Sequence, residues 1–523
     1  MNKIEILDST LRDGAQGENV SFSVRDKLNI VTTLDTFGVT YIEAGNPGSN
    51  PKDIEFFKEA LTLNLSNSKL CAFGSTRRKL ISISEDAGCL ALLSAMTPSV
   101  SIFGKSWALH AEKILCVSKE ENLKMIRDTV AFFHHHNREV IFDAEHFFDG
   151  FKDDSEYAIS VLNVAVLAGA QVIVLCDTNG GTMPDTIRSV TEFIVKRFPT
   201  VRIGIHCHND IGCAVANSLL AVSAGAKHVQ GTFIGIGERC GNADLASIIP
   251  TLQLKLGYCC TEKDLSSLTE ATMRIYDIAN LIPPTDRPYT GVSAFAHKGG
   301  MHIDGVEKYP RSFEHIDPKS VGNHRRYLMS EMSGRGAILN KLSTIAPELK
   351  KSSPETELIV AKLKELEHDG YQFESADASF ELTVLELLGR FKPSFSLQMY
   401  RTSGEFPSPD GKSPAWAVVK IEVNGKTETT ASFGNGPVNA LDLALRKGLV
   451  AFYPEVATIR LTDYKVRVLS GDAATGSKVR VLIENTDGRH IWTTTGVSAD
   501  IIAASWRALR DSIEYYLLTN KLS

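Results

Sequence analysis

The sequence predicts an α/β protein in three parts: a (β/α)8 or TIM barrel over residues 1–260, helical linker subdomains over 261–400, and a C-terminal α+β domain over 401–523. Two observations predict the barrel. Short apolar runs alternate with longer amphipathic stretches, as in a parallel sheet that helices cover. There are eight such runs in about 250 residues, which is typical of a closed barrel. An open doubly wound sheet is less well supported, because no Gly-x-Gly-x-x-Gly motif follows the first run.

In chain order, the apolar runs cover residues 3–8, 41–45, 70–74, 89–96, 139–146, 171–178, 202–209 and 228–235. Polar side chains gather where these runs end. Active sites of such barrels lie at the carboxyl ends of the strands. One polar residue at a strand end is as well explained by a helix cap, a rim ion pair or a turn. Because many polar residues follow the carboxyl ends of the predicted strands, together they favour an active site there.

Composition excludes several classes of partner. With 43% hydrophobic and 23% charged residues, the 523-residue chain is typical of globular proteins. Its net charge of -6 provides no basic surface for nucleic acid or an anionic membrane. The N-terminus lacks an apolar targeting segment, and no apolar run is long enough to cross a bilayer. The nine cysteines are scattered without a Cys-x-x-Cys pair, which favours a reducing, cytoplasmic location.

His206 and His208 are the first candidate metal ligands. They end the seventh run, and alternate residues of a strand point to the same face. Two neutral imidazoles make half of a divalent-metal site. Such a pair alone is more often a surface or hydrogen-bonded core feature. Asp13, in the polar segment after the first run, would supply the carboxylate oxygen of a three-ligand set.

Three separated motifs resemble one family. Asp-Ser-Thr-Leu-Arg-Asp-Gly-Ala-Gln (8–16), His-Cys-His-Asn-Asp (206–210) and Gly-Glu-Arg-Cys-Gly-Asn (237–242) are similar, in this order, to motifs of the 2-isopropylmalate, homocitrate and citramalate synthases. The resemblance extends over nearly the whole chain. Segments 102–107 and 143–150 resemble the citramalate synthase branch. This resemblance implies an acyltransferase that condenses acetyl-CoA with pyruvate and water to (R)-citramalate and CoA, in isoleucine, and hence branched-chain amino acid, biosynthesis.

The resemblance also implies roles for particular residues. A divalent ion, Mn²⁺, Zn²⁺ or Mg²⁺, would be held by Asp13, His206, His208 and Asn242, and would polarise the oxo acid. Arg12 would stabilise the developing negative charge, and Thr178 would bind the substrate carboxylate. Glu145 would transfer a proton or position the acetyl group. Gln16 and Glu43 would lie in the pocket. An alternative for Glu145 is an ion pair with an arginine at the barrel mouth.

Segment 295–305, rich in Gly and His, follows a proline-rich break at 283–288. In the family this segment reaches the active site of the partner subunit, and His302 matches its general acid or base. A linker histidine without a role is the alternative. The chain departs from the family at Phe313, where a Tyr is usual. Either Tyr309 substitutes for that phenol or the proton relay needs none.

The remaining chain predicts helices over 262–281, 355–370 and 379–389, a loop-rich hinge over 393–414, and then a repeated pattern. Strands at 416–423 and 426–432 flank the hairpin turn Asn424-Gly425, and a helix ends near residue 449. Strands at 464–469, 478–484 and 492–495 and a helix over 499–518 follow. Ala-Leu-Arg recurs at 444–446 and 508–510, an offset of 64 residues, so we expect two pseudo-symmetric units.

This repeated domain resembles the allosteric domain of the same synthases. The resemblance implies a homodimer that binds an amino-acid effector, isoleucine or leucine, between its subunits. Glycine-rich turns at 434–436 and 496–498 precede helices and would present backbone N–H groups to a carboxylate. A dimerisation domain without a ligand is the alternative.

Other functions stay open at this point. The oxo acid can be 2-oxoisovalerate or 2-oxoglutarate, as in 2-isopropylmalate or homocitrate synthase, although no second basic residue for a longer diacid stands out. A retro-aldol lyase resembling hydroxymethylglutaryl-CoA lyase is a different class, and the long C-terminal region argues against it. A non-catalytic amino-acid sensor is disfavoured because the Arg12, Asp13 and two-histidine set is intact.

Overall fold

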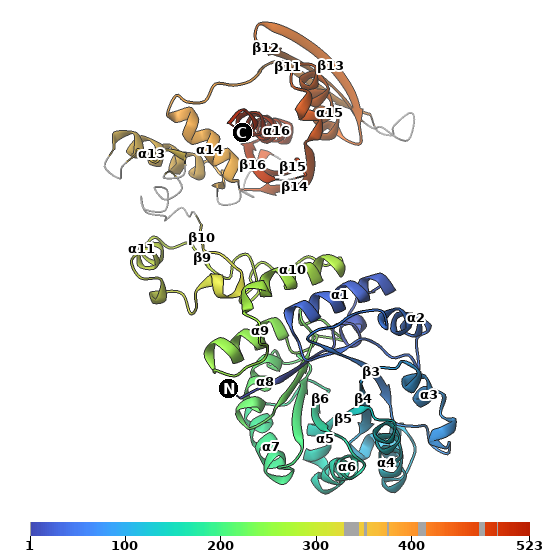
Figure 1. The fold of residues 1–523 in the computed structure, drawn as a ribbon. Coiled ribbons are helices and arrows are strands. Elements are labelled where there is room, and N and C mark those ends of the chain that lie inside the picture. The colour runs from blue at the N-terminus through green and yellow to red at the C-terminus, as the bar shows by residue number, and fades with distance from the viewer. Residues whose placement is uncertain are drawn as a thin grey trace. The chain divides into compact units, whose positions relative to one another are not determined.

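The computed structural model describes residues 2–328, 342, 345–349, 353–373, 376–405, 415–469, 476–488 and 490–522. It comprises two compact units, Met1–Ala296 with Glu314–Arg326, and His297–Phe313 with Tyr327–Ser523. The first unit contains the barrel and the second contains the C-terminal sheets (Figure 1). Among the described residues, no helix combines the length and apolar character needed to cross a membrane.

Eight parallel strands form a closed barrel, as predicted. Its strands are β1 (Glu5–Asp8), β2 (Tyr41–Glu43), β3 (Lys69–Ser75), β4 (Ser99–Lys105), β5 (Glu139–Glu145), β6 (Val172–Asp177), β7 (Arg202–Cys207) and β8 (His228–Gly231). Leu7 of β1 pairs with Tyr41 of β2, and Glu5 of β1 pairs with His228 of β8, so the sheet closes on itself. The carboxyl ends of all eight strands therefore meet at one mouth.

Helices surround this barrel (Figure 1). They are α1 (Val24–Phe37), α2 (Pro51–Ala60), α3 (Ala87–Ser94), α4 (Lys119–His135), α5 (Phe147–Asp153), α6 (Ser155–Leu167), α7 (Pro184–Arg197), α8 (Ala214–Ser223), α9 (Leu245–Pro250) and α10 (Leu268–Ile278). Strand alternation separates two apolar layers. Ile6 and Ile42 belong to the layer shared with the helices, whereas their neighbours Leu7 and Tyr41 belong to a smaller cluster inside the barrel.

The prediction of a fourth strand at 89–96 was wrong. These residues lie mostly in α3, whose N-cap Asp86 accepts a hydrogen bond from the Cys89 backbone N–H. The fourth strand is β4, which follows directly. An apolar run of eight residues does not by its periodicity distinguish a buried strand from a short buried helix. A capping residue in front of the run was the available signal.

The C-terminal region confirms the predicted repeat. Its two three-stranded antiparallel sheets are β11 (Ser396–Gly404), β12 (Ala415–Val423) and β13 (Lys426–Gly434), and β14 (Arg460–Val468), β15 (Val479–Thr486) and β16 (Ile491–Ser498). They pack against α15 (Pro437–Val450) and α16 (Ile501–Leu522), respectively. The two halves begin at residues 396 and 460, and the two helices at 437 and 501, so the offset of 64 residues holds throughout.

Two predictions for this region were wrong. Residues 396–404, predicted as part of a hinge, form edge strand β11, which pairs with β12; residues 406–414 lie outside the described part. Most side chains of β11 are exposed or half-buried, so the apolar alternation that reveals a strand is missing. Residues 496–498 do not form a turn but end β16. Helix α16 begins at Ile501, and the carboxylate of Asp500 just before it accepts the Ile502 N–H.

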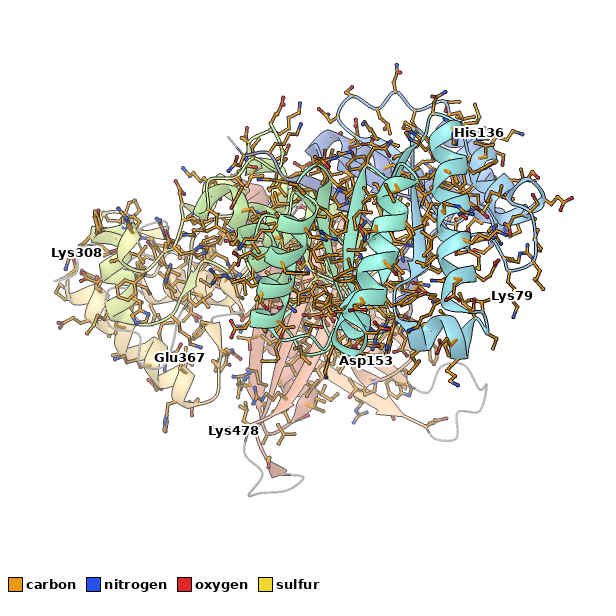
Figure 2. The ribbon with its side chains drawn as sticks, turned by 90° about the horizontal axis from the view of Figure 1, so that it is seen from below. Lys79, His136, Asp153, Lys308, Glu367 and Lys478 are labelled. Atoms are coloured by element: carbon orange, nitrogen blue, oxygen red, sulfur yellow. The ribbon has the colours of Figure 1, made fainter. Side chains whose placement is uncertain are left out.

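In sequence, the segment between the barrel and the C-terminal sheets consists of short helices and strands. These are α11 (Gly300–Lys308), the strand pair β9 (Ala296–His297) and β10 (Arg326–Tyr327), α13 (Pro354–His368) and α14 (Asp377–Leu387). Helix α14 packs on β16 and α16, and the Ser379 hydroxyl of α14 accepts the backbone N–H of Thr495 on β16. Lys478, labelled in Figure 2, pairs with Asp369 at the end of α13 at 3.2 Å. The two helices thus dock on the second half of the repeat.

An ion network joins the amino-terminal ends of five barrel strands. Arg202 of β7 contacts Glu5 of β1 at 2.5 Å and Glu139 of β5 at 2.8 Å. Tyr41 of β2 and Lys69 of β3 also donate to Glu139. Burial raises the pKa of Glu139, but the hydrogen bonds from Arg202 and Lys69 outweigh burial and lower it to about 2. The ionised glutamate therefore stabilises the closed barrel.

We expect Glu139→Gln to lower the free energy of unfolding by about 1–2 kcal/mol at pH 7, a value reduced for partial solvent screening. The folded-state pKa lies below the unfolded one, so the contribution is complete above about pH 5 and is lost as the pH falls toward 2. Urea unfolding at pH 7 and pH 3, followed by circular dichroism, measures it. As control, Glu192→Gln on α7 breaks an exposed pair and should leave the free energy of unfolding essentially unchanged. Equal losses for Glu139→Gln at both pH values would contradict this role.

Candidate functional site

The chain after β1 folds back over the barrel mouth. The Asp8 carboxylate accepts hydrogen bonds from the backbone N–H and hydroxyl of Thr10, a compact turn typical of Asp. The Thr10 hydroxyl in turn accepts the N–H of Phe233, just beyond β8. This arrangement fixes the turn against the last strand and brings Arg12 and Asp13 to the mouth, where β7 ends.

Asp13, His206 and His208 lie together, as predicted. One potential ligand atom of each lies within 4.8 Å of the others. The Asp13 Oδ2 atom is 3.5 Å from His206 Nε2 and 3.9 Å from His208 Nε2. All three residues are at most 5% exposed. A buried carboxylate facing two imidazole nitrogens is a donor set that suits a divalent cation.

The charge states of these three residues also suit a cation. Burial raises the pKa of Asp13, but the Arg12 guanidinium and then the two imidazoles hold it well below its usual range. Burial lowers the pKa of His206, and it lowers that of His208 to about 4. At neutral pH the set is therefore one anion and two neutral imidazoles, the forms that bind metals. Among the described residues, His208 Nδ1 has no hydrogen-bond partner.

Asn242, in the loop after β8, lies beside the cluster of Asp13, His206 and His208. Its Nδ2 donates to Asp13 Oδ1 at 3.0 Å, while its buried Oδ1 has no partner among the described residues. An orphaned oxygen beside the ligands fits a place near a cation. Gly237 makes room for this side chain: its φ is +156°, and a Cβ there would lie 2.2 Å from Asn242 Nδ2. The glycine of the third motif is therefore required sterically.

Arg12 is held by two carboxylates. Its Nε donates to Glu43 Oε2 at 2.6 Å and its NH1 to Asp13 Oδ2 at 2.9 Å. Its guanidinium carbon lies 3.8 Å from the ring centroid of Phe73. Glu43 also accepts the Ser9 hydroxyl at 2.5 Å and is fully buried. Glu43 thus holds Arg12 in place. It was predicted in the pocket, but it is not among the residues that line the cavity.

Thr178 follows β6 and is oriented by its neighbour. Its hydroxyl oxygen accepts the backbone N–H of His146 at 2.9 Å, so its proton remains available to donate. His146 has a left-handed backbone conformation, with φ of +56°. Such a conformation in a non-glycine residue is a local strain that is common at functional sites.

Glu145 forms an ion pair, but with Lys105 rather than with an arginine. The two residues are direct neighbours at the ends of β4 and β5. Both are largely buried, with side chains 15% and 23% exposed. The pairing predicted as an alternative to an active-site role exists, yet Glu145 also lines the cavity, so the two interpretations are compatible.

These residues surround one cavity of about 210 Å³ at the barrel mouth. Its lining residues are Arg12, Asp13, Gln16, Phe73, Phe103, Asp143, Glu145, Cys176, Thr178, His206, His208 and Glu238. Phe73 and Phe103 stack at 5.2 Å and form its apolar side. Phe73, Phe103, Asp143 and Cys176 were not predicted as lining residues. Strand alternation was the available signal, since Asp143 and Glu145 are two residues apart on β5 and face the same way.

His302 belongs to the second compact unit, whereas the predicted barrel residues belong to the first. It lies on α11, with its ring stacked on that of Phe313 at 4.5 Å. Tyr309 ends the same helix and is 62% exposed. Phe313 has no phenol, so its own side chain cannot donate or accept a proton in this segment.

The family models and the similar proteins together match almost the whole chain. The HMGL-like family model matches residues 3–275, the homocitrate synthase post-HMGL domain-like model 289–370, and the LeuA allosteric (dimerisation) domain model 374–517. An (R)-citramalate synthase of Aquifex aeolicus is 50% identical over 99% of this chain and 98% of its own. One of Synechocystis is 47% identical over 98% and 96%, and a 2-isopropylmalate synthase of Methanocaldococcus jannaschii is 30% identical over 99% and 95%. The chain therefore belongs to the HMGL-like family, among the acyltransferases that include the (R)-citramalate synthases.

Proposed function

We propose that this protein condenses acetyl-CoA with pyruvate and water to give (R)-citramalate and CoA. The observation that supports it most is the convergence of Asp13, His206 and His208 beside an anchored arginine and a small cavity. The similarity to (R)-citramalate synthases along almost the full chain supports the same activity. In this reaction the acetyl methyl carbon bonds to C2 of the oxo acid, and water then cleaves the thioester.

We propose Asp13, His206 and His208 as ligands of a divalent metal, with Asn242 beside them. When bound, Mn²⁺, Zn²⁺ or Mg²⁺ supplies Lewis-acid activation of the keto group. The chain's own residues do the rest. Arg12, whose position is fixed by Glu43, offers its remaining N–H groups to the oxygen on which negative charge develops. Thr178 donates its free hydroxyl proton to the substrate carboxylate.

Glu145, fixed by Lys105, positions the acetyl group or accepts a proton at the cavity wall. Gln16, exposed at the cavity edge, contacts the substrate there. His302 is proposed as the acid–base residue that a partner subunit supplies in a homodimer. Without a phenol at residue 313, its imidazole would exchange protons with Tyr309 or solvent.

The size and polarity of the cavity favour pyruvate. The stacked rings of Phe73 and Phe103 form the apolar side of the cavity of about 210 Å³, and these two bulky rings favour a methyl group over a branched chain beside them. Among the described residues that line it, Arg12 is the only arginine or lysine, and its partners are Asp13 and Glu43. A second carboxylate, as in 2-oxoglutarate, would have no cation to bind.

The C-terminal domain is proposed as the regulatory and dimerisation domain, with the barrel as catalytic domain and residues 261–400 as linker. An amino-acid effector, isoleucine or leucine, would bind there, consistent with a role in branched-chain amino acid synthesis. Helix α15 begins at Pro437, and Gly436 before it provides no side-chain cap, which leaves the backbone N–H groups that follow Pro437 for a carboxylate. The acyl-CoA substrate and the free cysteines favour a cytoplasmic location.

Asp13→Ala should reduce turnover at least about 100-fold and remove tight Mn²⁺ binding, because it deletes the only carboxylate of the ligand set. Calorimetry measures Mn²⁺ affinity, and thiol detection measures CoA release. Asp185→Asn, at the exposed start of α7, is the control and should change neither. An Asp13→Ala protein that binds Mn²⁺ like the parent would refute the ligand assignment.

In a panel of 2-oxo acids, CoA release should be fastest with pyruvate. Phe103→Ala enlarges the apolar side of the cavity, so we expect kcat/KM for 2-oxoisovalerate relative to pyruvate to rise about tenfold or more. Phe193→Ala, which truncates a half-exposed ring on α7, is the matched control. Absence of CoA release with every oxo acid would refute the synthase, and an unchanged ratio in Phe103→Ala would refute the size argument.

Gly436→Asp should abolish inhibition by isoleucine or leucine, because the new carboxylate caps α15 and competes with that of the effector. The change is sterically permitted: the backbone there is extended, and a Cβ would meet no atom within 4 Å. Gly436→Ala adds the same Cβ without the charge and should remain inhibited. Inhibition curves of CoA release compare the three proteins. Unchanged inhibition of Gly436→Asp would exclude this helix end as the effector site.

A further inference from the structure

A buried polar chain connects His206 to the opposite side of the barrel. His206 of β7 and Gln230 of β8 are direct neighbours, and His206 Nδ1 lies 3.0 Å from Gln230 Oε1. Gln230 Nε2 donates to Asp143 Oδ1 on β5 at 2.9 Å. The Ser101 hydroxyl of β4 donates to Asp143 Oδ2 at 2.6 Å. Gln230 and Ser101 are fully buried, and Asp143 is 4% exposed.

The chemistry of these groups fixes the direction of each hydrogen bond. Asp143 accepts at both oxygens, Oδ2 from the Ser101 hydroxyl and Oδ1 from Gln230 Nε2, so Gln230 turns its NH₂ to Asp143. The other end of the amide, its carbonyl oxygen, then faces His206. A carbonyl oxygen only accepts, so His206 Nδ1 must bear the proton. In a neutral imidazole the lone pair is then on Nε2, the atom that lies 3.5 Å from Asp13 Oδ2.

We propose that Gln230 is a positioning residue that, braced by Asp143 and Ser101, holds His206 in the tautomer and ring orientation in which Nε2 binds the metal. This inference rests on the proposed metal site. It distinguishes the two histidines: His208 Nδ1 has no such partner among the described residues, so its orientation depends on its backbone and on its ligand. Outer partners of ligating histidines commonly raise metal affinity by orienting the ring.

The buried polar chain also explains why a glutamine occupies position 230. Its amide is the acceptor for His206 and the donor to Asp143 at once, and it adds no charge to an interior that already contains Asp143 and Glu43. A hydrocarbon side chain of the same length would leave the His206 N–H and one Asp143 oxygen unpaired in a buried place.

The test measures Mn²⁺ dissociation constants by calorimetry on the full chain. We expect Gln230→Leu to weaken Mn²⁺ binding about 10–100-fold. Gln230→Glu retains an oxygen for the His206 N–H and, by sharing a proton with Asp143, a donor to it, so it should restore affinity to within a few-fold of the parent. As the matched control, His228→Gln replaces a buried polar residue two positions earlier on β8 and should leave Mn²⁺ affinity unchanged.

Thermal unfolding of each apo-protein separates positioning from a purely structural role. Retained parental affinity in Gln230→Leu would overturn the proposal. Equal losses of affinity in all three variants, in proportion to their loss of stability, would also overturn it. If the parent itself fails to bind Mn²⁺, the metal site fails, which is a different outcome from a binding parent with an unaffected Gln230→Leu variant.

Discussion

The contact of Arg12 with Asp13 and Glu43 is the interaction on which the site depends. It connects the turn after β1 to the end of β2, and it keeps a buried carboxylate ionised opposite two uncharged imidazoles. Barrel closure is what makes this possible. Because β1 pairs with β8, and β8 with β7, the residues after the first strand lie beside those at the end of the seventh, although almost two hundred residues separate them in sequence.

Much of this arrangement follows from the sequence. The i, i+2 spacing of His206 and His208 predicts a common face, and the count of apolar runs predicts a barrel whose mouth collects the strand ends. Both predictions are confirmed. The prediction of the fourth strand was wrong for a physical reason. Residues 89–96 are apolar enough for a buried strand or a buried helix, and only the Asp86 cap indicates the helix. Strand β11 was not predicted because its side chains are mostly exposed, so its sequence lacks the apolar alternation of a strand.

The inward-facing polar residues of the barrel were harder to predict. Asp143, Gln230 and Ser101 come from three different strands, and each alone resembles an ordinary strand residue. Their relation appears only when the register across the barrel is known. The anchoring of Arg12 by Glu43 is likewise a property of the closed fold. Motifs therefore identified the residues that we propose as ligand-binding, and the three-dimensional structure identified those that hold them in place.

The docking of α14 on β16 has a consequence for solubility. Outer strands of small sheets expose backbone N–H groups to which strands of other molecules can add, and this is a common route to fibrils. In the second half of the repeat, Ser379 satisfies the N–H of Thr495 and a helix lies along that strand. The chain thus shields one of its own strands from intermolecular pairing with a neutral hydroxyl and a helix, instead of the charged residues or prolines that many β-proteins use.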